Sequence, residues 1–417
     1  MGQLNTSKEL EIKVKIQKIV REYFNIKHKD KNYPFIPGYT AIPAMGTVYD
    51  EEELMMLVES CLDYNQSDGK FKKQFEMNFL KITNLKHLIL VNSFPTAILL
   101  ALSALFSPVL NKRSIKSGDE VITSATTPPK TVEILVNKGI IPVFADIKIG
   151  SYNIDISHLN RALSRKTKAV IVSHSMGIPA EIEAISKFCQ KNGLWLIEDC
   201  SKALGVYING YHAGNFSDIS LFSFCNKDHI SMIQGGAVAT NIELLKEIML
   251  INYEYQTNDD FNIDLPDINA AIGVAQLRKL QYFINTRKRN FEIIHQNLKN
   301  YQEYIVLPEK NPYSNFNPIC FPIFIQNNSF LSRNKLLNYL NNYKIGTEYL
   351  NDNVTKHPKF LKMKYKKAIN LKNSNYISSN SFCIGVYPGL TEEMVDYSSS
   401  KIIEYISSIL EEYYMVS

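Results

Sequence analysis

The residues from Leu194 to Gly205 read LWLIEDCSKALG, and the first half of this pattern recurs along much of the chain. Its start, Leu194 to Glu198, is a short apolar run, which predicts a buried strand. Asp199 follows directly, and ligands in sheets of parallel strands bind where strands end and helices begin. From these residues alone, Asp199 is equally well interpreted as a ligand contact or as the N-cap of a helix that begins at Ser201.

Six further apolar runs alternate with segments of helical periodicity, which is typical of a mostly parallel sheet covered by helices on both faces. These runs are His87 to Val91, Glu120 to Thr123, Ile141 to Ala145, Ala169 to Val172, Ile219 to Phe224 and Ala237 to Thr240. Together the seven predicted strands indicate an α/β fold with one large seven-stranded sheet.

The chain divides into three expected parts. Apolar residues at helical spacing, followed by a stretch with Pro and Gly, predict a helical arm and loop over residues 1–50. Residues 51–286 form the predicted large domain. A long helical pattern after Ala270 and a strand at Ile319 to Ile325 predict a smaller α+β domain over residues 287–417.

The composition narrows the class of protein. The 417 residues are 45% hydrophobic, and 46 basic against 41 acidic side chains give a formal charge of +5, a dispersed excess that does not favour nucleic acid as a partner. The N-terminus has charges where a signal peptide needs an apolar segment, and the most apolar stretch, Ala97 to Phe106, is too short to span a membrane. Six scattered cysteines lack metal-ligand spacing and predict a reduced, cytoplasmic chain.

Three stretches resemble the DegT/StrS family of pyridoxal-phosphate-dependent nucleotide-sugar aminotransferases and dehydratases: LWLIEDCSKALG, HAGNFSDISLFSF (His212 to Phe224) and IQGGAVATN (Ile233 to Asn241). The resemblance is greatest to its 3-dehydrase branch, which acts on CDP-4-keto-6-deoxyglucose in lipopolysaccharide synthesis. It implies the fold-type-I transferase architecture and a homodimer with sites at the subunit interface. It also implies a nucleotide-linked keto-sugar substrate in surface-polysaccharide synthesis and pyridoxal or pyridoxamine phosphate as cofactor.

Three positions of the implied cofactor site match the family. Asp199 matches the aspartate that pairs with the pyridine nitrogen and keeps the ring an electron sink. Ser223 matches a serine that contacts the cofactor phosphate, and Asn262 matches an asparagine that reaches the phosphate from the other subunit. Either of these two is equally well a capping or loop residue.

The phosphate-binding loop departs from the family pattern S-G-S/T-x-A. Here it reads SFPTA from Ser93 to Ala97. Ser93 and Thr96 remain, but Phe94 puts bulk where glycine lets backbone N–H groups approach the anion, and Pro95 has no N–H. Pro128 falls where an aromatic residue stacks on the cofactor ring. Weak or absent cofactor binding is expected.

The position of the family's Schiff-base lysine, which is histidine in the dehydrases, is occupied by Asp228, in the sequence Lys227-Asp228-His229. A carboxylate can act as a general base but cannot form an imine. Lys227 takes the imine role only if the loop is shifted, and is otherwise part of a solvated turn. His229 matches a second histidine of the dehydrase pattern H-H-I-T-M, here D-H-I-S-M. These three residues are the catalytic candidates.

Further departures concern the dehydrase's iron–sulfur cluster and its substrate loops. The segment from Tyr253 to Asp260 has no cysteine, so no iron–sulfur cluster is expected. Glu348 stands where the dehydrase has an arginine, a poor neighbour for a diphosphate. The dehydrase loop W-L-T-T-G-R-F is replaced by Asn65 to Phe71.

Three hypotheses follow. In the first, the protein is a 3-dehydrase-like enzyme in which pyridoxamine phosphate condenses with the C4 ketone, Asp228 or His229 moves a proton and the C3 hydroxyl leaves. In the second, it is a catalytically silent family member that binds a sugar nucleotide or an active paralogue. In the third, it is a cofactor-free enzyme that uses Lys130, Lys227, Asp228 and His229 as acid, base or anion-binding groups.

Overall fold

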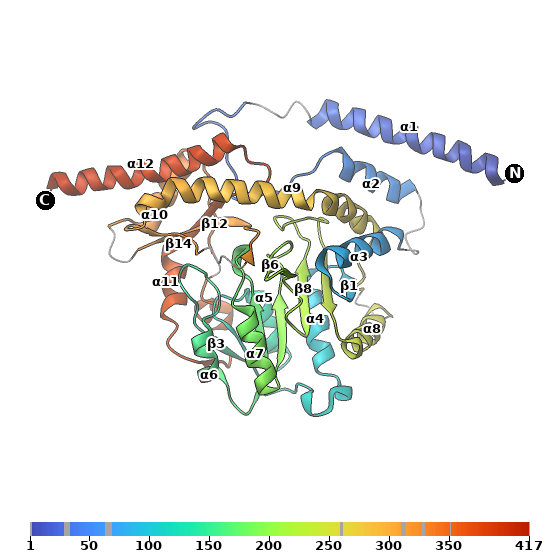
Figure 1. Ribbon diagram of the computed structural model, residues 1–417, viewed down its shortest axis with the longest axis horizontal. Helices are drawn as coiled ribbons and strands as arrows, with labels where there is room; N and C mark the ends of the chain where they lie inside the picture. The colour runs from blue at the N-terminus through green and yellow to red at the C-terminus, as the bar shows by residue number, and fades with distance from the viewer. Residues whose placement is uncertain are drawn as a thin grey trace.

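The computed structural model describes residues 2–28, 34–62, 69–258, 262–309, 314–326, 330–350 and 352–416. A body built on a large sheet lies beneath the long helix α9 (Asp267–Leu298) (Figure 1). Helix α12 (Glu392–Val416) packs on α9 and helix α1 (Gly2–His28) packs on α2 (Glu51–Leu62), and α1 and α12 extend to opposite sides of the molecule. Within the described ranges, no helix is both long and apolar enough to cross a bilayer.

The large sheet has eight strands in the order β1-β9-β8-β5-β4-β2-β3-β13. Their bounds are β1 His87–Val91, β2 Glu120–Ser124, β3 Ile141–Ala145, β4 Thr167–Ser173, β5 Trp195–Asp199, β8 Ile219–Ser223, β9 Gly236–Thr240 and β13 Lys366–Lys367. The seven predicted strands are confirmed, and the expected number is corrected to eight by β13. This edge strand consists of two exposed lysines, so no apolar run marks it in the sequence.

The sheet is mostly parallel, with only β9 antiparallel to its neighbours β1 and β8. Both faces are buried, because alternate strand residues enter two different apolar clusters. Leu196 packs in the cluster with helices α3 (Lys70–Thr83), α7 (Ile182–Asn192) and α9, whereas Ile197 packs with α4 (Phe94–Leu105), α5 (Pro129–Asn137) and α8 (Glu243–Asn258). The near-continuous hydrophobic runs of the sequence reflect this two-sided burial.

The C-terminal part forms a separate three-stranded antiparallel sheet in the order β10-β12-β14. The elements of this region are β10 Ile305–Val306, β12 Cys320–Ile325, α10 Arg333–Asn342, α11 Lys372–Asn380 and β14 Ser381–Gly385. Helix α9 runs without a break through the predicted boundary at residue 287. The division into three parts therefore stays a prediction.

Short elements complete the chain. Helix α2 (Glu51–Leu62) packs on α9, and α6 (Leu159–Ala162) packs on β3. A third sheet joins β11 (Ser314–Asn315), β6 (Tyr207–Ile208) and β7 (Tyr211–His212). The 3₁₀ segments are Pro108–Arg113, Ile156–His158, Ser175–Gly177, Lys299–Tyr301, Val354–Lys356 and Pro358–Phe360.

Four neighbouring parallel strands end in polar residues: Ser124 ends β2, Ser173 ends β4, Asp199 ends β5 and Ser223 ends β8. Ser173 and Asp199 are paired directly in the register. Carboxyl ends of parallel strands meet at one edge of a sheet, which is where ligands bind in folds of this kind. The fold thus gathers these four side chains at one place.

Candidate functional site

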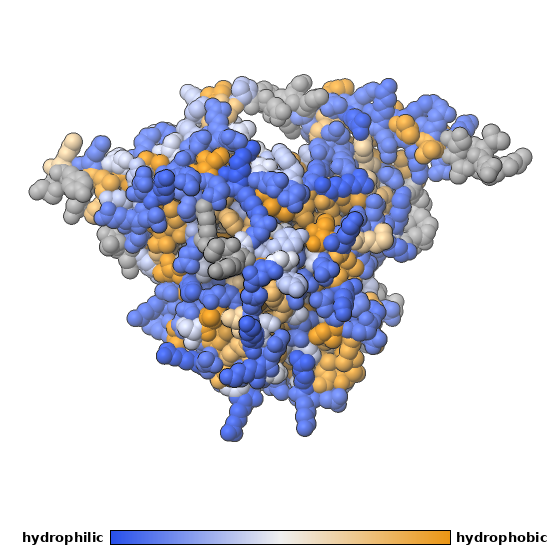
Figure 2. Space-filling view, in the orientation of Figure 1, coloured by the Kyte–Doolittle hydropathy of each residue, from blue (hydrophilic) through white to orange (hydrophobic). Residues whose placement is uncertain are grey.

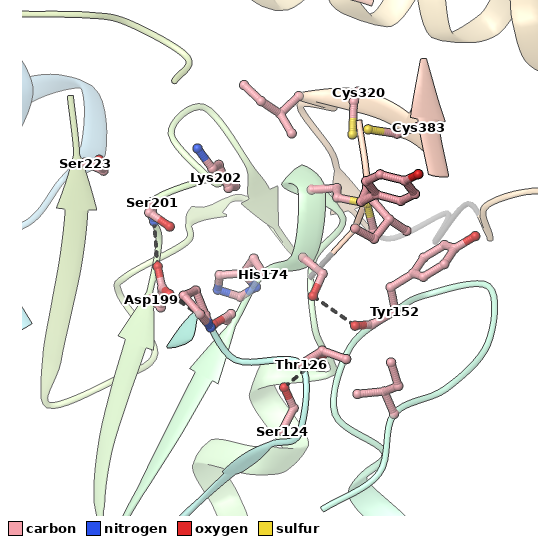
Figure 3. A pocket seen from close by; sticks show the side chains of 18 of the residues that line it. Ser124, Thr126, Tyr152, His174, Asp199, Ser201, Lys202, Ser223, Cys320 and Cys383 are labelled. Carbon is pink, nitrogen blue, oxygen red and sulfur yellow. Dashed lines mark hydrogen bonds between the residues drawn. The ribbon is translucent and has the colours of Figure 1, made fainter. Parts of the chain in front are cut away.

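A pocket of about 350 Å³ lies at this edge of the sheet. Figure 3 shows Asp199, Ser201, Lys202 and Ser223 on one side of it, with Tyr152, Cys320 and Cys383 on the other. The two cysteines come from β12 and β14, so the second sheet forms part of the wall. Pro128 and Phe94 also line the pocket.

Asp199 is almost completely buried at the pocket wall. One carboxylate oxygen accepts a hydrogen bond from the Ser201 backbone N–H at 3.0 Å and the other from the Ser173 hydroxyl at 3.0 Å. The helix that the capping interpretation placed at Ser201 is absent, because residues 201–202 and 204–205 form turns. Asp199 therefore caps a turn, and its side chain still faces the pocket.

Lys202 is a site residue that the sequence analysis did not select. It follows Asp199 by three residues, lines the pocket, and forms an ion pair with Asp228. Burial lowers the pKa of Lys202, but the charge of Asp228 and its hydrogen bond outweigh this effect, so the pKa is raised above its ordinary value. The ammonium form thus predominates at neutral pH.

Asp228 lies behind Lys202, outside the pocket lining, and is 4% exposed. Its Oδ2 accepts hydrogen bonds from the Ser223 hydroxyl at 2.6 Å and from the Cys225 backbone N–H at 2.8 Å, while Oδ1 pairs with Lys202. These three donors satisfy a buried charge that would otherwise be costly. They also direct the carboxylate toward the Lys202 amine.

The neighbours of Asp228 point elsewhere. Lys227 has a positive φ of 72°, and its Nζ lies 2.8 Å from Glu348 Oε1 on the surface. The His229 ring is buried, with Nε2 at 2.9 Å from the Lys202 carbonyl and Nδ1 at 3.1 Å from Asn317 Nδ2. Burial, reinforced by Arg287, holds the pKa of His229 well below its usual value, so the ring is neutral.

Lys130, the remaining candidate of the cofactor-free hypothesis, pairs with Glu133 at 3.4 Å on α5. Neither Lys130, Lys227 nor His229 belongs to the residues that line the pocket. Asp228 is connected to the pocket by its ion pair with Lys202, whereas Lys130, Lys227 and His229 do not reach the pocket. Glu348 lies near the pocket wall, since its backbone pairs with that of Cys383.

At the edge of the pocket, the loop before α4 is closed by hydrogen bonds among its own residues. The hydroxyls of Ser93 and Thr96 lie 2.7 Å apart, and the Thr96 hydroxyl donates to Asn92 Oδ1 at 2.7 Å. Ser93 caps α4 by accepting from the Thr96 N–H, with Pro95 in the first turn. The Phe94 side chain faces the pocket.

Asn262 lies beside this loop in its own chain. Its carbonyl accepts from Asn92 Nδ2 at 2.8 Å, and its side-chain oxygen accepts from the Asp264 N–H at 2.9 Å. The predicted contact across a subunit interface stays a prediction. Of the replaced dehydrase loop, residues 65–68 lie outside the described part of the chain, as do residues 259 and 260 of the segment without cysteine.

The model of the DegT/DnrJ/EryC1/StrS aminotransferase family matches residues 48–403. The chain belongs to this family. It is 34% identical to the lipopolysaccharide biosynthesis protein RfbH of Salmonella typhimurium, over 94% of this chain and 98% of that protein. It is 31% identical to the dTDP-4-dehydro-2,6-dideoxy-D-glucose 3-dehydratase of Saccharopolyspora spinosa, over 93% and 91% of the two chains. These matches confirm the family and branch indicated by the sequence motifs.

A solved structure supports the fold. The E. coli GDP-4-keto-6-deoxy-D-mannose 3-dehydratase, described with bound hydrated pyridoxal phosphate (PLP), superposes with a TM-score of 0.80 at 27% identity, covering 86% of this chain and 98% of that one. The α/β fold-type-I architecture is therefore confirmed.

The residues of this pocket fit only part of such a cofactor. Asp199 is placed to pair with a ring nitrogen. The phosphate half does not fit, because Phe94 occupies the approach, Pro95 lacks an N–H, and the hydroxyls of Ser93 and Ser223 are bonded within the protein. Pro128 offers no aromatic face. At the phosphate half, these residues therefore do not match the family's loop pattern.

One group of potential metal ligands occurs within the described residues: His174, Glu198 and Cys200, all buried. Glu198 Oε2 accepts from the Gly214 N–H at 2.7 Å and lies 3.2 Å from His174 Nε2. The backbone N–H of Phe216 donates to Glu198 Oε1 at 3.2 Å. These bonds join β5 to the following loop, so a structural role explains the group without a metal ion.

Proposed function

We propose that this protein acts on a nucleotide-linked 4-keto-6-deoxy sugar in surface-polysaccharide synthesis, using the family's strand-end pocket without the family's way of holding PLP. The observation that carries the proposal is that Asp199 and Lys202 both line a pocket whose cofactor-phosphate loop is closed, with Lys202 paired to the buried Asp228. The named activities of its relatives support the substrate class, since they include 3-dehydratases of dTDP- and GDP-linked keto sugars.

The pocket has polar groups suited to a sugar. Tyr152 is 3% exposed and lines the pocket, and its hydroxyl has no hydrogen-bond partner among the described residues. A buried hydroxyl without a partner is costly, and a sugar hydroxyl or ketone would satisfy it. Burial raises the pKa of Tyr152, so this hydroxyl stays neutral and can donate.

The closed phosphate loop favours the cofactor-free form of this function over the 3-dehydrase mechanism. Loss of the C3 hydroxyl in that mechanism depends on pyridoxamine phosphate, and the residues here do not hold its phosphate. The same closed loop supports a second candidate, a catalytically silent family member that binds the sugar nucleotide without changing it.

The experiment is titration calorimetry with GDP-4-keto-6-deoxy-D-mannose and with dTDP-4-dehydro-2,6-dideoxy-D-glucose, followed by mass spectrometry and NMR of the recovered sugar. We expect binding of at least one of them and a changed product without added cofactor. Binding with unchanged sugar would support the silent family member, and the lack of any binding would refute both candidates. Lys227→Ala serves as control because this surface lysine lies outside the pocket.

We also expect a homodimer, as in the family, with the N-terminal arm in the interface. Several apolar side chains of α1 are exposed in the single chain, including Ile12, Ile19 and Ile26 on one side of the helix. Such a row of unpaired apolar groups favours contact with a partner. Size-exclusion chromatography with light scattering tests this, and a strictly monomeric protein at micromolar concentration contradicts it.

A further inference from the structure

We infer that Lys202 is the amine of this pocket that forms an imine with the ketone carbon of the bound sugar. Lys202 and the Asp228 position, where the family has its lysine, lie on different loops, and the two side chains meet at the pocket wall. The inference rests on the proposed function, because it takes the nucleotide-linked keto sugar as the ligand. It transfers the imine role from the position after β8, where this chain has Asp228, to the end of β5.

The geometry places an amine beside the position at which this chain lacks the family's lysine. Asp228 occupies the motif's lysine position, and the amine that reaches its carboxylate belongs to Lys202. Among the described residues that line the pocket, Lys202 is the only lysine. Its side chain is 38% exposed, so the amine is partly open to a ligand while paired.

The backbone and partners of Lys202 are held in place. Its carbonyl is bonded to the His229 ring, and the carboxylate of Asp228 is fixed by Ser223 and Cys225. Asp199, three residues earlier in the chain, is held by hydrogen bonds from Ser173 and Ser201. A nucleophile positioned by a rigid shell loses little freedom on reaction.

The Lys202–Asp228 pair can carry out imine formation with the ketone without another reactant. Asp228 takes a proton from the Lys202 ammonium, and the neutral Nζ adds to the C4 carbonyl carbon to give a carbinolamine. Asp228 returns the proton to the carbinolamine oxygen, which leaves as water when the C=N bond forms. The net change is ammonium plus ketone to protonated imine plus water, with the positive charge still facing the carboxylate.

The other lysines considered from the sequence do not meet these conditions. Lys227 is paired with Glu348 on the surface, and Lys130 is paired with Glu133 on a helix. Lys227 is nevertheless a matched control, because it lies next to Asp228 in the sequence and carries the same amine.

The test is reductive trapping. The wild-type protein and the Lys202→Arg and Lys227→Arg variants are incubated with GDP-4-keto-6-deoxy-D-mannose and cyanoborohydride, and the modified peptides are mapped by mass spectrometry. We expect a stoichiometric sugar adduct on Lys202 in the wild type and in Lys227→Arg, and its loss in Lys202→Arg. Circular dichroism and calorimetry on the same samples show whether each variant folds and binds.

Sugar binding without an adduct, or an adduct on Lys227, would overturn this inference while leaving the proposed function standing. The lack of sugar binding would overturn the proposed function itself. If Lys202→Arg does not fold, Asp228→Asn replaces it. This variant keeps the amine and must give the adduct on Lys202 at lower pH than the wild type; an unchanged pH dependence overturns the inference.

Discussion

Two adjacent residues of the turn after β8 each form an ion pair, one exposed to solvent and the other buried. Lys227 pairs with Glu348, and both side chains are well exposed, at 55% and 40%. Asp228, the next residue, is buried and pairs with Lys202 at the pocket wall. Adjacent residues in a turn with a left-handed residue face opposite sides, so the nearest lysine in the sequence is not the lysine that serves the pocket.

The largest effect should be seen when either lysine is tested for covalent capture of PLP. We expect no stoichiometric adduct after desalting and borohydride reduction, and binding weaker by roughly a hundredfold to a few thousandfold than with an intact loop, since lost charged hydrogen bonds cost roughly 1.5–3 kcal/mol each and lost stacking roughly 0.5–1.5. The Phe94→Gly, Pro95→Ser double variant should regain affinity. A stoichiometric adduct on Lys227 would reverse the roles assigned to the two lysines.

The buried pair should matter far more for stability than the exposed one. Asp228→Ala leaves the Lys202 charge and the Ser223 and Cys225 donors without their partner, which should lower the free energy of unfolding by about 2–4 kcal/mol. Urea denaturation of the wild type and the variant measures this loss. A loss as small as that of Lys227→Ala would show that the two pairs are equivalent.

Much of this picture could be predicted from the sequence, for identifiable reasons. Strands buried on both faces give near-continuous apolar runs, which is why β5 and its neighbours are where the pattern places them. The family motif located Asp199 and the substitution at Asp228. The departure of the loop at Ser93 from the phosphate-binding pattern followed from residue chemistry, because Pro95 has no N–H and Phe94 fills the space that glycine leaves open.

The remainder depends on side-chain direction and on contacts distant in sequence. Lys202 and Asp228 are 26 residues apart, and no periodicity relates them. The expected helix at Ser201 is a turn, since Asp199 accepts the Ser201 N–H within a short loop instead of capping a helix. Edge strand β13 has no apolar pattern, and it is placed by its pairing with β3 and by the ion pair of Lys366 with Glu120.

The pH dependence of reductive trapping of the sugar on Lys202 tests how Asp228 controls this amine. Several ionisable groups lie around Lys202: Asp228, Asp199, Cys225, Cys320 and His229. Because Asp228 raises the pKa of Lys202 against the effect of burial, the wild-type amine stays charged until the pH exceeds its ordinary pKa. In Asp228→Asn, burial remains and the opposing charge is lost, so the pKa should fall.

We therefore expect the rate of adduct formation to rise with pH in both proteins, and to rise at lower pH in Asp228→Asn. The same sign holds for stability. The stabilisation from the raised pKa of Lys202 is present below the ordinary lysine pKa and is lost as the pH rises through the folded-state value. Rate profiles measured by quenched mass spectrometry decide the point, and coincident profiles would mean that Asp228 does not control the amine.

The smallest effect is expected for the exposed pair. Lys227→Ala removes a surface ion pair, which should change the free energy of unfolding by about 0.2–1 kcal/mol and leave sugar binding unchanged. Denaturation at low and high salt measures both the size of this effect and its screening. A larger loss that salt does not reduce would indicate that Lys227 has a role beyond the surface.

The most direct test of the account is a crystal structure of the protein with GDP-4-keto-6-deoxy-D-mannose, grown above neutral pH. We expect continuous density between Lys202 Nζ and the C4 carbon of the sugar, with Asp228 beside the new bond and the Tyr152 hydroxyl bonded to the sugar. A sugar bound in the pocket with its C4 carbon turned away from Lys202, or bonded to Lys227, would contradict it.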